Sequence, residues 1–236
     1  MSEYIYGRNP VIEGIKAGRV KKLYIQGGLE GSAKKIFAMA REEKILITEV
    51  SKRKLDELAE GGNHQGVVAL ANKFKYSSLE EIISLGIEKI LILDKIEDPH
   101  NFGAIARSAE AFGFKGIIIP KRNSVYVTDT VVKVSAGAVE NLKIAIEINL
   151  SNAIEKLKDS GYWVYATKMD GENLYDTDLS GKVVLIIGNE GKGVSQNLLK
   201  HSDKVIKIPM QGDINSLNAS CAASVIMAEV SSRKYR

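Results

Sequence analysis

The stretch KILILDKIEDPHNFGAIARSAEAFGF, Lys89 to Phe114, contains the pattern that decides the fold. Residues 89–94 are a short apolar run rich in Ile and Leu, which is typical of a parallel strand covered on both faces. In the stretch from Asp98 to Phe114, apolar residues recur every three or four positions, which indicates an amphipathic helix. A buried strand followed directly by a helix is the repeating unit of a parallel α/β sheet.

Five more apolar runs of similar length occur further along the chain. They are GIIIP at 116–120, LKIAIEI at 142–148, YWVYAT at 162–167, VVLIIG at 183–188 and KVIKIP at 204–209. Segments with helical spacing separate these runs, so we expect a doubly wound parallel sheet in this part of the chain. Ligands of such sheets bind where loops leave the carboxyl ends of the strands.

The first third of the chain alternates shorter helical and strand-like segments. Helical spacing occurs in NPVIEGIKAG, SAKKIFAMAREE and KRKLDELAE, and strand-like runs are KLYIQG, ILITEV and QGVVALA. This pattern predicts a small α/β/α domain at residues 1–72. The polar and basic residues 73–79 would be a linker, and residues 80–236 would form the second domain.

The composition is that of a globular protein. Of 236 residues, 44% are hydrophobic and 26% are charged, and no low-complexity tract is present. The N-terminus has no apolar run of signal-peptide length, and no stretch approaches the roughly 20 apolar residues of a membrane span. We therefore expect a cytoplasmic protein that does not span a membrane.

Cysteine and histidine usage argues against disulfides and metal sites. The single cysteine, Cys221, stands among Ala and Ser residues, where we expect a buried, unreactive thiol. The three histidines, His64, His100 and His201, lack the spacing of metal ligands. We expect no protein-bound metal.

Positive charge is concentrated in the first third of the chain. Residues 1–76 contain 14 Lys and Arg against 9 Asp and Glu, a net charge of +5, whereas the remaining residues have a net charge of −1. This asymmetry fits a domain that binds a polyanion, and it fits a solvated basic surface equally well. Composition alone leaves both interpretations open.

Three loops at predicted strand ends contain the residues capable of chemistry. They are DKIEDPHNFGAIARS, GNEGKGVS and IPMQGDINSLNAS. Each combines Gly or Pro with short polar residues that bend the backbone. GNEGKGVS lacks the Lys-Ser/Thr pair of a phosphate-binding loop, and its carboxylate, Glu190, would repel phosphate. We expect the loops to line one pocket for a ligand that is not multiply anionic.

Arg107 is the unusual residue of the helix after the first of these strands. It falls on a face with Gly103, Ala104 and Ala111, the smallest side chains available. A surface ion pair with Glu110 would explain the arginine, and so would a ligand that uses the bare face. Spacing alone favours the ion pair.

Asparagine and serine residues of the same loops also have two interpretations. Asn101 is a candidate N-cap of its helix, and Asn215 or Ser216 is a candidate N-cap of the last helix. Asn218 lies one turn further in, where Asn is unfavourable, so we expect it to need a hydrogen-bond partner outside the helix.

The three loops together, in this order and spacing, resemble the motifs of the SpoU (TrmH-like) family of RNA ribose 2'-O-methyltransferases. The matching stretches are DPHNFGAIARSAEAFG, LIIGNEGKGVS and IPMQGDINSLNASCAAS. The N-terminal IYGRNPVIEGIKAG and GGNHQGVVALA resemble the substrate-binding module of the branch that includes the bacterial 23S rRNA guanosine 2'-O-methyltransferase. The resemblance covers nearly the whole chain.

The resemblance implies features that periodicity does not show. The small N-terminal α/β/α domain would resemble ribosomal protein L30e, and the second domain would be a SPOUT parallel-sheet domain with a deep trefoil knot that forms a homodimer. The knot loops of the family hold S-adenosyl-L-methionine. The implied cofactor positions in this sequence are Thr167, Gly188, Ile208 and Leu217.

The implied catalytic residues come from all three motifs. They are Asn101, Arg107, Glu190, Ser216 and Asn218. The implied reaction is methyl transfer to a ribose 2'-OH, and Arg107 would hold an RNA phosphate and orient the nucleotide. Arginine stays protonated near neutral pH, which makes it a poor base and favours this role. In the family's dimer, Arg107 of one subunit could lie beside the cofactor of the other.

The function we expect is therefore S-adenosylmethionine-dependent 2'-O-methylation of RNA, with a guanosine of 23S rRNA as the target. Two alternatives stay open: the same reaction on tRNA, and a non-catalytic RNA-binding or ribosome-binding relative of the fold. The basic N-terminal domain would contact RNA phosphates, and its turn GGNHQG, residues 61–66, is either an RNA-facing loop or a flexible strand entry.

Overall fold

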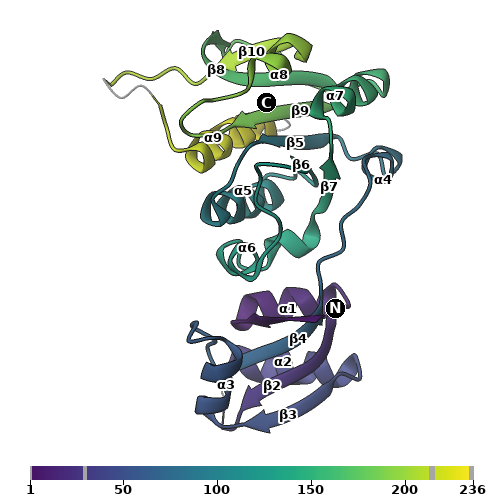
Figure 1. Ribbon diagram of the computed structural model, residues 1–236, viewed down its shortest axis with the longest axis vertical. Helices are drawn as coiled ribbons and strands as arrows, with labels where there is room; N and C mark the ends of the chain where they lie inside the picture. The colour runs from purple at the N-terminus through teal and green to yellow at the C-terminus, as the bar shows by residue number, and fades with distance from the viewer. Residues whose placement is uncertain (1, 29–30, 213–215, 234–236) are drawn as a thin grey trace. The chain divides into compact units, whose positions relative to one another are not determined.

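The computed structural model describes residues 2–28, 31–212 and 216–233. By internal contacts the chain divides into two units, each with its own sheet (Figure 1). The first unit comprises residues up to 75 and the segment 127–141, and the second comprises residues 76–126 and those from 142 onward. The segment 127–141 thus has its contacts in the first unit, whereas the expected boundary places it in the second domain.

The first unit contains a four-stranded mixed sheet. Across the sheet the strands are β1 (Ser2–Tyr6), β4 (Val67–Asn72), β2 (Val20–Gln26) and β3 (Leu46–Val50). β4 pairs antiparallel with β1 and β2, and β2 pairs parallel with β3. The sequence did not indicate β1, because it is an edge strand in which only Ile5 is buried.

Helices cover both faces of this sheet, as the α/β/α pattern predicts. They are α1 (Arg8–Lys16), α2 (Ser32–Glu42) and α3 (Lys52–Leu58). α1 packs against α2 and lies so close to the sheet that a Cβ on Gly14 would be 2.6 Å from the Cδ1 atom of Ile5. α3 contributes Leu55 to a separate core that includes Val68. Alternate residues of a strand face opposite sides, which separates the two cores.

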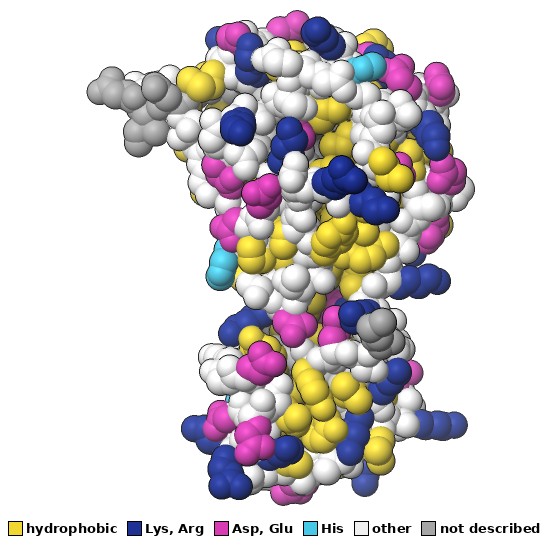
Figure 2. All heavy atoms as spheres, viewed as in Figure 1, with side chains coloured by type: hydrophobic (Ala, Val, Ile, Leu, Met, Phe, Trp, Pro, Cys, Tyr) yellow, Lys and Arg dark blue, Asp and Glu magenta, His cyan; other side chains and the backbone are white. Residues whose placement is uncertain are grey.

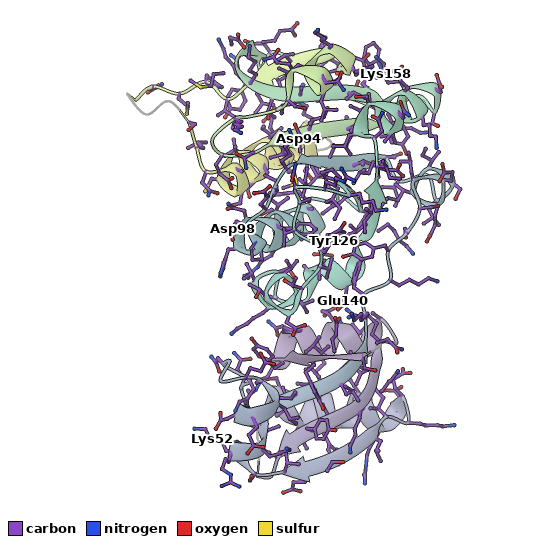
Figure 3. All side chains as sticks on the ribbon, in the orientation of Figure 1. Lys52, Asp94, Asp98, Tyr126, Glu140 and Lys158 are labelled. Atoms are coloured by element: carbon purple, nitrogen blue, oxygen red, sulfur yellow. The ribbon has the colours of Figure 1, made fainter. Side chains whose placement is uncertain are left out.

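Buried charges hold the segment 127–141 within the first unit. The segment forms α6 (Asp129–Val134) and a 3-10 helix (Ala138–Asn141). The Arg19 guanidinium donates to the carboxylates of Glu3 and Glu140 and to the carbonyl oxygen of Asn72. The side chains of Arg19 and Glu140 are only 9% and 1% exposed. Glu140 is labelled in Figure 3.

This ion pair opposes a large desolvation cost. Burial raises the pKa of the Glu140 carboxyl, and the Arg19 guanidinium counteracts the rise. If one partner of such a pair is removed, the other charge is left buried without a partner. The arrangement is therefore sensitive to the loss of Arg19.

Arg19→Met should lower the free energy of unfolding by about 3 kcal/mol or more, because Glu140 loses its buried partner. Without the guanidinium the pKa of Glu140 rises further, so the native state binds a proton that the unfolded state releases. Stability then falls as pH rises, and the loss should be larger at pH 8 than at pH 5. Denaturant unfolding at the two pH values measures it.

Lys35→Met is the matched control, since Lys35 is an exposed cation of α2. It should change stability by less than about 0.5 kcal/mol. An Arg19 variant that unfolds like this control would contradict the role of the ion pair.

The second unit contains the parallel sheet that the sequence predicts. Across the sheet the strands are β10 (Lys204–Lys207), β8 (Trp163–Asn173), β9 (Val183–Gly188), β5 (Lys89–Asp94), β6 (Gly116–Pro120) and β7 (Lys143–Glu147). All neighbouring pairs are parallel. β8 extends beyond its predicted end because its last residues follow β10 after a shift in register.

Helices cover both faces of the second sheet. They are α4 (Leu79–Ser84), α5 (Pro99–Ala111), α7 (Leu150–Asp159), α8 (Gln196–His201) and α9 (Ala219–Ser232). Ile90 and Ile92 of β5 share a core with residues of α4, α7 and α8. Leu91 and Leu93 are also buried and point to the other face, where α5 and α9 lie side by side (Figure 1).

Two further properties of the helices bear on the sequence-based expectations. Cys221 is exposed on α9, so its expected burial was wrong; the buried positions of this turn are taken by Ala219 and Ala223. Within the described ranges, every helix is too short or too polar to cross a bilayer.

Candidate active site

The first two motif loops meet where the strand order of the sheet reverses. β5 and β9 are neighbours in the sheet, although three other strands separate them in the chain. Residues 95–98 follow β5 and residues 189–195 follow β9. The third loop, residues 208–218, leads from β10 to α9, which packs beside α5. Open parallel sheets bind ligands in the crevice at such a switch point.

Asn101, Glu190 and Asn218, one residue from each motif, form a hydrogen-bonded chain. Asn101 lies in the first turn of α5, is buried, and donates from Nδ2 to Oε1 of Glu190. Asn218 donates from Nδ2 to Oδ1 of Asn101 at 3.0 Å. Both ends of the Asn101 amide are therefore used, and the three loops are joined at one side chain.

The N-cap of α5 is not Asn101. Asp98 has this role, and its carboxylate accepts a hydrogen bond from the backbone N–H of His100 at 2.8 Å. Figure 3 labels Asp98 at the start of the helix. The capping interpretation of Asn101 is therefore wrong, and its amide is left for Glu190 and Asn218.

The N-cap of α9 is Asn218. Its Oδ1 accepts from the backbone N–H groups of Ser220 at 2.9 Å and Cys221 at 3.4 Å. The expectation that Asn218 lies inside the helix was wrong, because the helix starts later, at Ala219. The expected partner outside the helix is confirmed as Asn101.

The two residues considered as caps of α9 do not have that role in the part of the chain that the structure describes. Ser216 is exposed and precedes the helix by three residues, and the structure does not bring it into the Asn101 network. Asn215 lies outside the described residues.

Arg107 is exposed on α5 and has no hydrogen bond or ion pair with any other residue that the structure describes. The partner considered for it, Glu110, instead pairs with Lys115 at 3.1 Å. Of the small residues expected on its face of the helix, Gly103 is buried, Ala104 is half-buried and Ala111 is exposed. Arg107 is therefore available to an anionic ligand.

Three of the expected cofactor positions lie at the ends of neighbouring strands. Thr167 directly follows Ala166, the last residue of β8 that pairs with β9; Gly188 is the last residue of β9, and Ile208 follows β10. The hydroxyl of Thr167 donates to the carbonyl oxygen of Ile186 at 3.0 Å, so it ties β8 to β9. Leu217, the fourth position, is 40% exposed on the third loop.

Gly188 cannot be replaced without moving the second loop. A Cβ at this position would be 2.1 Å from the carbonyl carbon of Gly193 and 2.2 Å from the nitrogen of Val194. The end of β9 and the loop are thus in direct backbone contact, which only glycine permits.

Asn189 holds the second loop in shape, a role that the sequence did not indicate. Its Nδ2 donates to the carbonyl oxygen of Lys95 at 3.1 Å, and its Oδ1 accepts from the N–H of Gly191 at 3.0 Å. Its own carbonyl oxygen accepts from the N–H of Gly193 at 2.8 Å. The first and second loops are therefore fastened to each other.

Asp94 makes a second connection between these loops. It ends β5, is 3% exposed, and its Oδ2 accepts from the backbone N–H of Ser195 at 2.7 Å (labelled in Figure 3). The position of a carboxylate directly after a buried strand was the only sequence signal for this role.

A cavity of about 600 Å³ opens beside the fastened loops. Its walls come from the loops after β5, β6 and β9, and the residues are Asp94, Lys95, Glu97, Asn123, Asn189, Lys192, Gly193, Val194, Ser195 and Gln196. None of the predicted catalytic or cofactor residues lines it. Among the described residues, no three His, Cys, Asp or Glu side chains are grouped as metal ligands.

Comparison with known proteins identifies the family. Residues 88–228 match the SpoU rRNA methylase family, and residues 4–77 match the module described as RNA 2'-O ribose methyltransferase substrate binding. The chain belongs to the SpoU family of RNA methyltransferases, as the motifs indicated.

Individual relatives agree with this assignment. YacO of Bacillus subtilis, named for the TrmH family of tRNA/rRNA methyltransferases, is 40% identical over 97% of this chain and 94% of its own. An AdoMet-bound rRNA methyltransferase from Sinorhizobium meliloti has a TM-score of 0.83 at 27% identity, over 100% of this chain and 88% of that one. The SpoU methyltransferase AviRb from Streptomyces viridochromogenes, solved with AdoMet, has a TM-score of 0.82 at 24% identity over 99% and 91% of the two chains, which supports the fold.

Asn218→Asp separates the two roles of Asn218. Asp is as good an N-cap as Asn, so the melting temperature should fall only by the roughly 3–6 °C that corresponds to one lost hydrogen bond in a chain of this size. The carboxylate cannot donate to Asn101, so methyl transfer to RNA should fall about tenfold or more, which corresponds to one lost hydrogen bond of about 1.4 kcal/mol. Thermal unfolding and transfer of a labelled methyl group measure the two effects.

Asn218→Ala is the comparison variant, because it loses the cap as well as the donor. It should be both less stable and less active. If Asn218→Asp methylates RNA at the wild-type rate, the hydrogen bond to Asn101 has no part in the reaction.

Proposed function

We propose that this protein methylates a ribose 2'-OH of ribosomal RNA, with a guanosine of 23S rRNA as the target. The observation that carries the proposal is the hydrogen-bonded chain Glu190–Asn101–Asn218, which joins the three motif loops at the switch point of the sheet. The matching family model is described as an rRNA methylase, which favours rRNA over tRNA. Related proteins are named for both kinds of RNA.

The expected cofactor positions fit S-adenosyl-L-methionine, which is bound in the solved relative from Sinorhizobium meliloti. They offer backbone groups at Gly188 and Ile208 and apolar surface at Leu217, which is 40% exposed. A cofactor with a sulfonium and an adenosine needs this kind of surface and no phosphate-binding loop. When bound, it supplies a methyl group made electrophilic by the positive sulfur.

The residues of the hydrogen-bonded chain would position the ribose. Glu190 uses Oε1 to accept from Asn101, so its second oxygen is available to a ribose hydroxyl. Ser216 is exposed and stands two residues before Asn218 in the sequence. Its hydroxyl would be a further hydrogen-bonding group for the ribose. Fixing the 2'-OH in line with the methyl group converts an encounter into an intramolecular step, which is a major source of rate enhancement.

Arg107 would clamp an RNA phosphate beside the reacting ribose. Its guanidinium is exposed and unpaired with respect to the described residues, and it can bind two phosphate oxygens at once. Because arginine stays protonated, its contribution is orientation and charge stabilisation; the 2'-OH proton leaves to another acceptor, such as the clamped phosphate.

The first unit would supply RNA affinity. Figure 2 shows Lys and Arg side chains spread over its visible surface with Asp and Glu among them. The GGNHQG turn is held firmly, since His64 is buried, accepts from the N–H of Gly66 at 2.9 Å and lies 3.0 Å from Asp56. The carbonyl oxygen of Gln65 in this turn also accepts from the Arg8 guanidinium at 3.3 Å. A hydrogen-bonded turn in contact with a basic side chain favours the RNA-facing interpretation over a flexible strand entry.

The homodimer and the trefoil knot stay predictions. Ala111 and Cys221 are exposed small residues on α5 and α9, the two helices that pack side by side. A partner subunit could approach this surface closely, and the partner would then lie beside Arg107. In such a dimer Arg107 would serve the partner's cofactor.

Mapping of 2'-O-methyl groups tests the function directly. RNA from a strain that lacks the protein is incubated with the purified protein and S-adenosyl-L-methionine, and the new modifications are located by sequencing. We expect one guanosine of 23S rRNA to be modified. Methylation confined to tRNA would refute the choice of substrate, and no methylation of either RNA would refute the enzymatic function.

Arg107→Ala should lower turnover by about 100-fold or more, because orientation of the phosphate is lost. Its Kd for S-adenosyl-L-methionine, measured by calorimetry, should stay within about twofold of the wild type. Arg107→Lys keeps the charge without the planar pair of donors and should recover part of the rate. An alanine variant with wild-type turnover would contradict the clamp.

A further inference from the structure

None of the residues assigned to catalysis and cofactor binding lines the cavity at the carboxyl ends of β9, β5 and β6. Its volume, about 600 Å³, lies within the range of ligand-binding sites in proteins. We propose that it holds the RNA nucleotide that adjoins the methylated one and thereby selects which ribose reaches Asn101 and Glu190. This inference rests on the proposed function.

The walls of the cavity are fixed by hydrogen bonds between loops. Asn189 joins the loop after β9 to Lys95, and Asp94 joins it again through Ser195. The loop after β6 is tied to the first loop by the N–H of Val125, which donates to the carbonyl oxygen of Ile96 at 2.9 Å. The cavity is therefore formed before any ligand arrives, as is usual for binding sites.

The side chains in the cavity include several with unused hydrogen-bonding capacity. Lys95, Asn123, Lys192 and Gln196 are exposed, and none has a side-chain hydrogen bond or ion pair with another residue that the structure describes. The lysines supply cationic donors, while each amide supplies both a donor and an acceptor. Bases of single-stranded RNA are recognised by such groups on their exposed edges.

The charges of the cavity favour a nucleotide within an RNA chain over a free polyphosphate. Two cations, Lys95 and Lys192, are balanced by Asp94 and Glu97, and the Asp94 carboxylate is already occupied by the N–H of Ser195. A triphosphate would meet too much negative charge here. A nucleotide within an RNA chain has a neutral base and is flanked by one phosphate on its 5' side and one on its 3' side, which matches two lysines and two amides.

The cavity adjoins the candidate catalytic loop directly. Asn189 and Lys192 line it, and Glu190 stands next to Asn189 in the chain, where consecutive Cα atoms are about 3.8 Å apart. Consecutive nucleotides of an RNA chain are joined through one phosphodiester group, so they lie close together. A ribose held by Glu190 therefore has its neighbour within reach of the cavity.

The expected cofactor positions lie on β9 itself and on the strands that follow it on the side away from β5. Thr167, Gly188 and Ile208 stand on β8 and β9 and just after β10, whereas the cavity stands over β9, β5 and β6. The loop after β9 would thus separate the cofactor from the RNA strand, with Glu190 between them.

A charge-removal experiment tests the cavity without requiring turnover. The double variant carries Lys95→Met and Lys192→Met. Each substitution removes the ammonium group but keeps an unbranched side chain and the backbone, including the Lys95 carbonyl oxygen that accepts from Asn189. The Kd for a fluorescein-labelled single-stranded oligoribonucleotide is measured over a range of salt concentrations. Loss of two phosphate contacts should lower the slope of log K against log salt by about 1.4 and weaken binding about tenfold or more at low salt.

Lys182→Met is the control for removal of a charge outside the cavity; the Lys182 ammonium donates to the carbonyl oxygen of Ser160 at 3.1 Å, so this variant also loses one hydrogen bond. Lys182 precedes β9 and so lies at the opposite end of that strand from the cavity. It should leave the slope unchanged, and the melting temperatures of all variants are measured to verify folding. Lys192→Met alone, on the exposed loop, should lower the slope by about 0.7 and serves if the double variant is unstable.

The possible outcomes decide the inference. If the salt slope of the double variant equals that of Lys182→Met, the inference is overturned. A fivefold or larger rise in the Kd of the double variant for S-adenosyl-L-methionine would also overturn it, since the cavity would then bind the cofactor. Asn123→Ala should raise KM for a 23S rRNA transcript with less change in kcat. If the wild type methylates no RNA, the proposed function fails, while the salt slope still decides whether the cavity binds RNA.

Discussion

The fixed orientation of one side-chain amide is the constraint on which the candidate active site depends. The Asn101 amide has a donor end and an acceptor end, and these are used by Glu190 and Asn218 respectively. The two partners come from loops far apart in the chain, which meet only because β5 and β9 are neighbours and α9 packs beside α5. The order of the strands in the sheet therefore determines which side chains meet at Asn101. No single motif could produce this arrangement alone.

The strands of the second unit could be predicted closely because burial on both faces leaves uninterrupted apolar runs, such as KILILD and VVLIIG. Edge strand β1 has only one buried residue and gave no such signal. The start of α9 was misplaced for a different reason. Several Asn and Ser residues precede it, all of them good caps, and the choice of Asn218 coincides with its bond to Asn101.

The residue types of the candidate site could be predicted from motif resemblance, but their surroundings could not. Spacing favoured an ion pair for Arg107, yet Glu110 pairs with Lys115, which lies beyond the end of the helix. The contacts of Asn189 and Asp94 depend on the adjacency of β5 and β9, which is a long-range property. The cavity depends on three loops at once, so local sequence holds no signal for it.

The buried pair Arg19–Glu140 has a consequence for how the protein is made. The two residues are separated by 121 positions, and β5 and β6 of the second sheet are synthesised between them. During synthesis, Arg19 therefore cannot pair with Glu140 until β5 and β6 of the second sheet have also been synthesised. The order of folding is then interleaved, and no single cut in the gene yields a complete first unit.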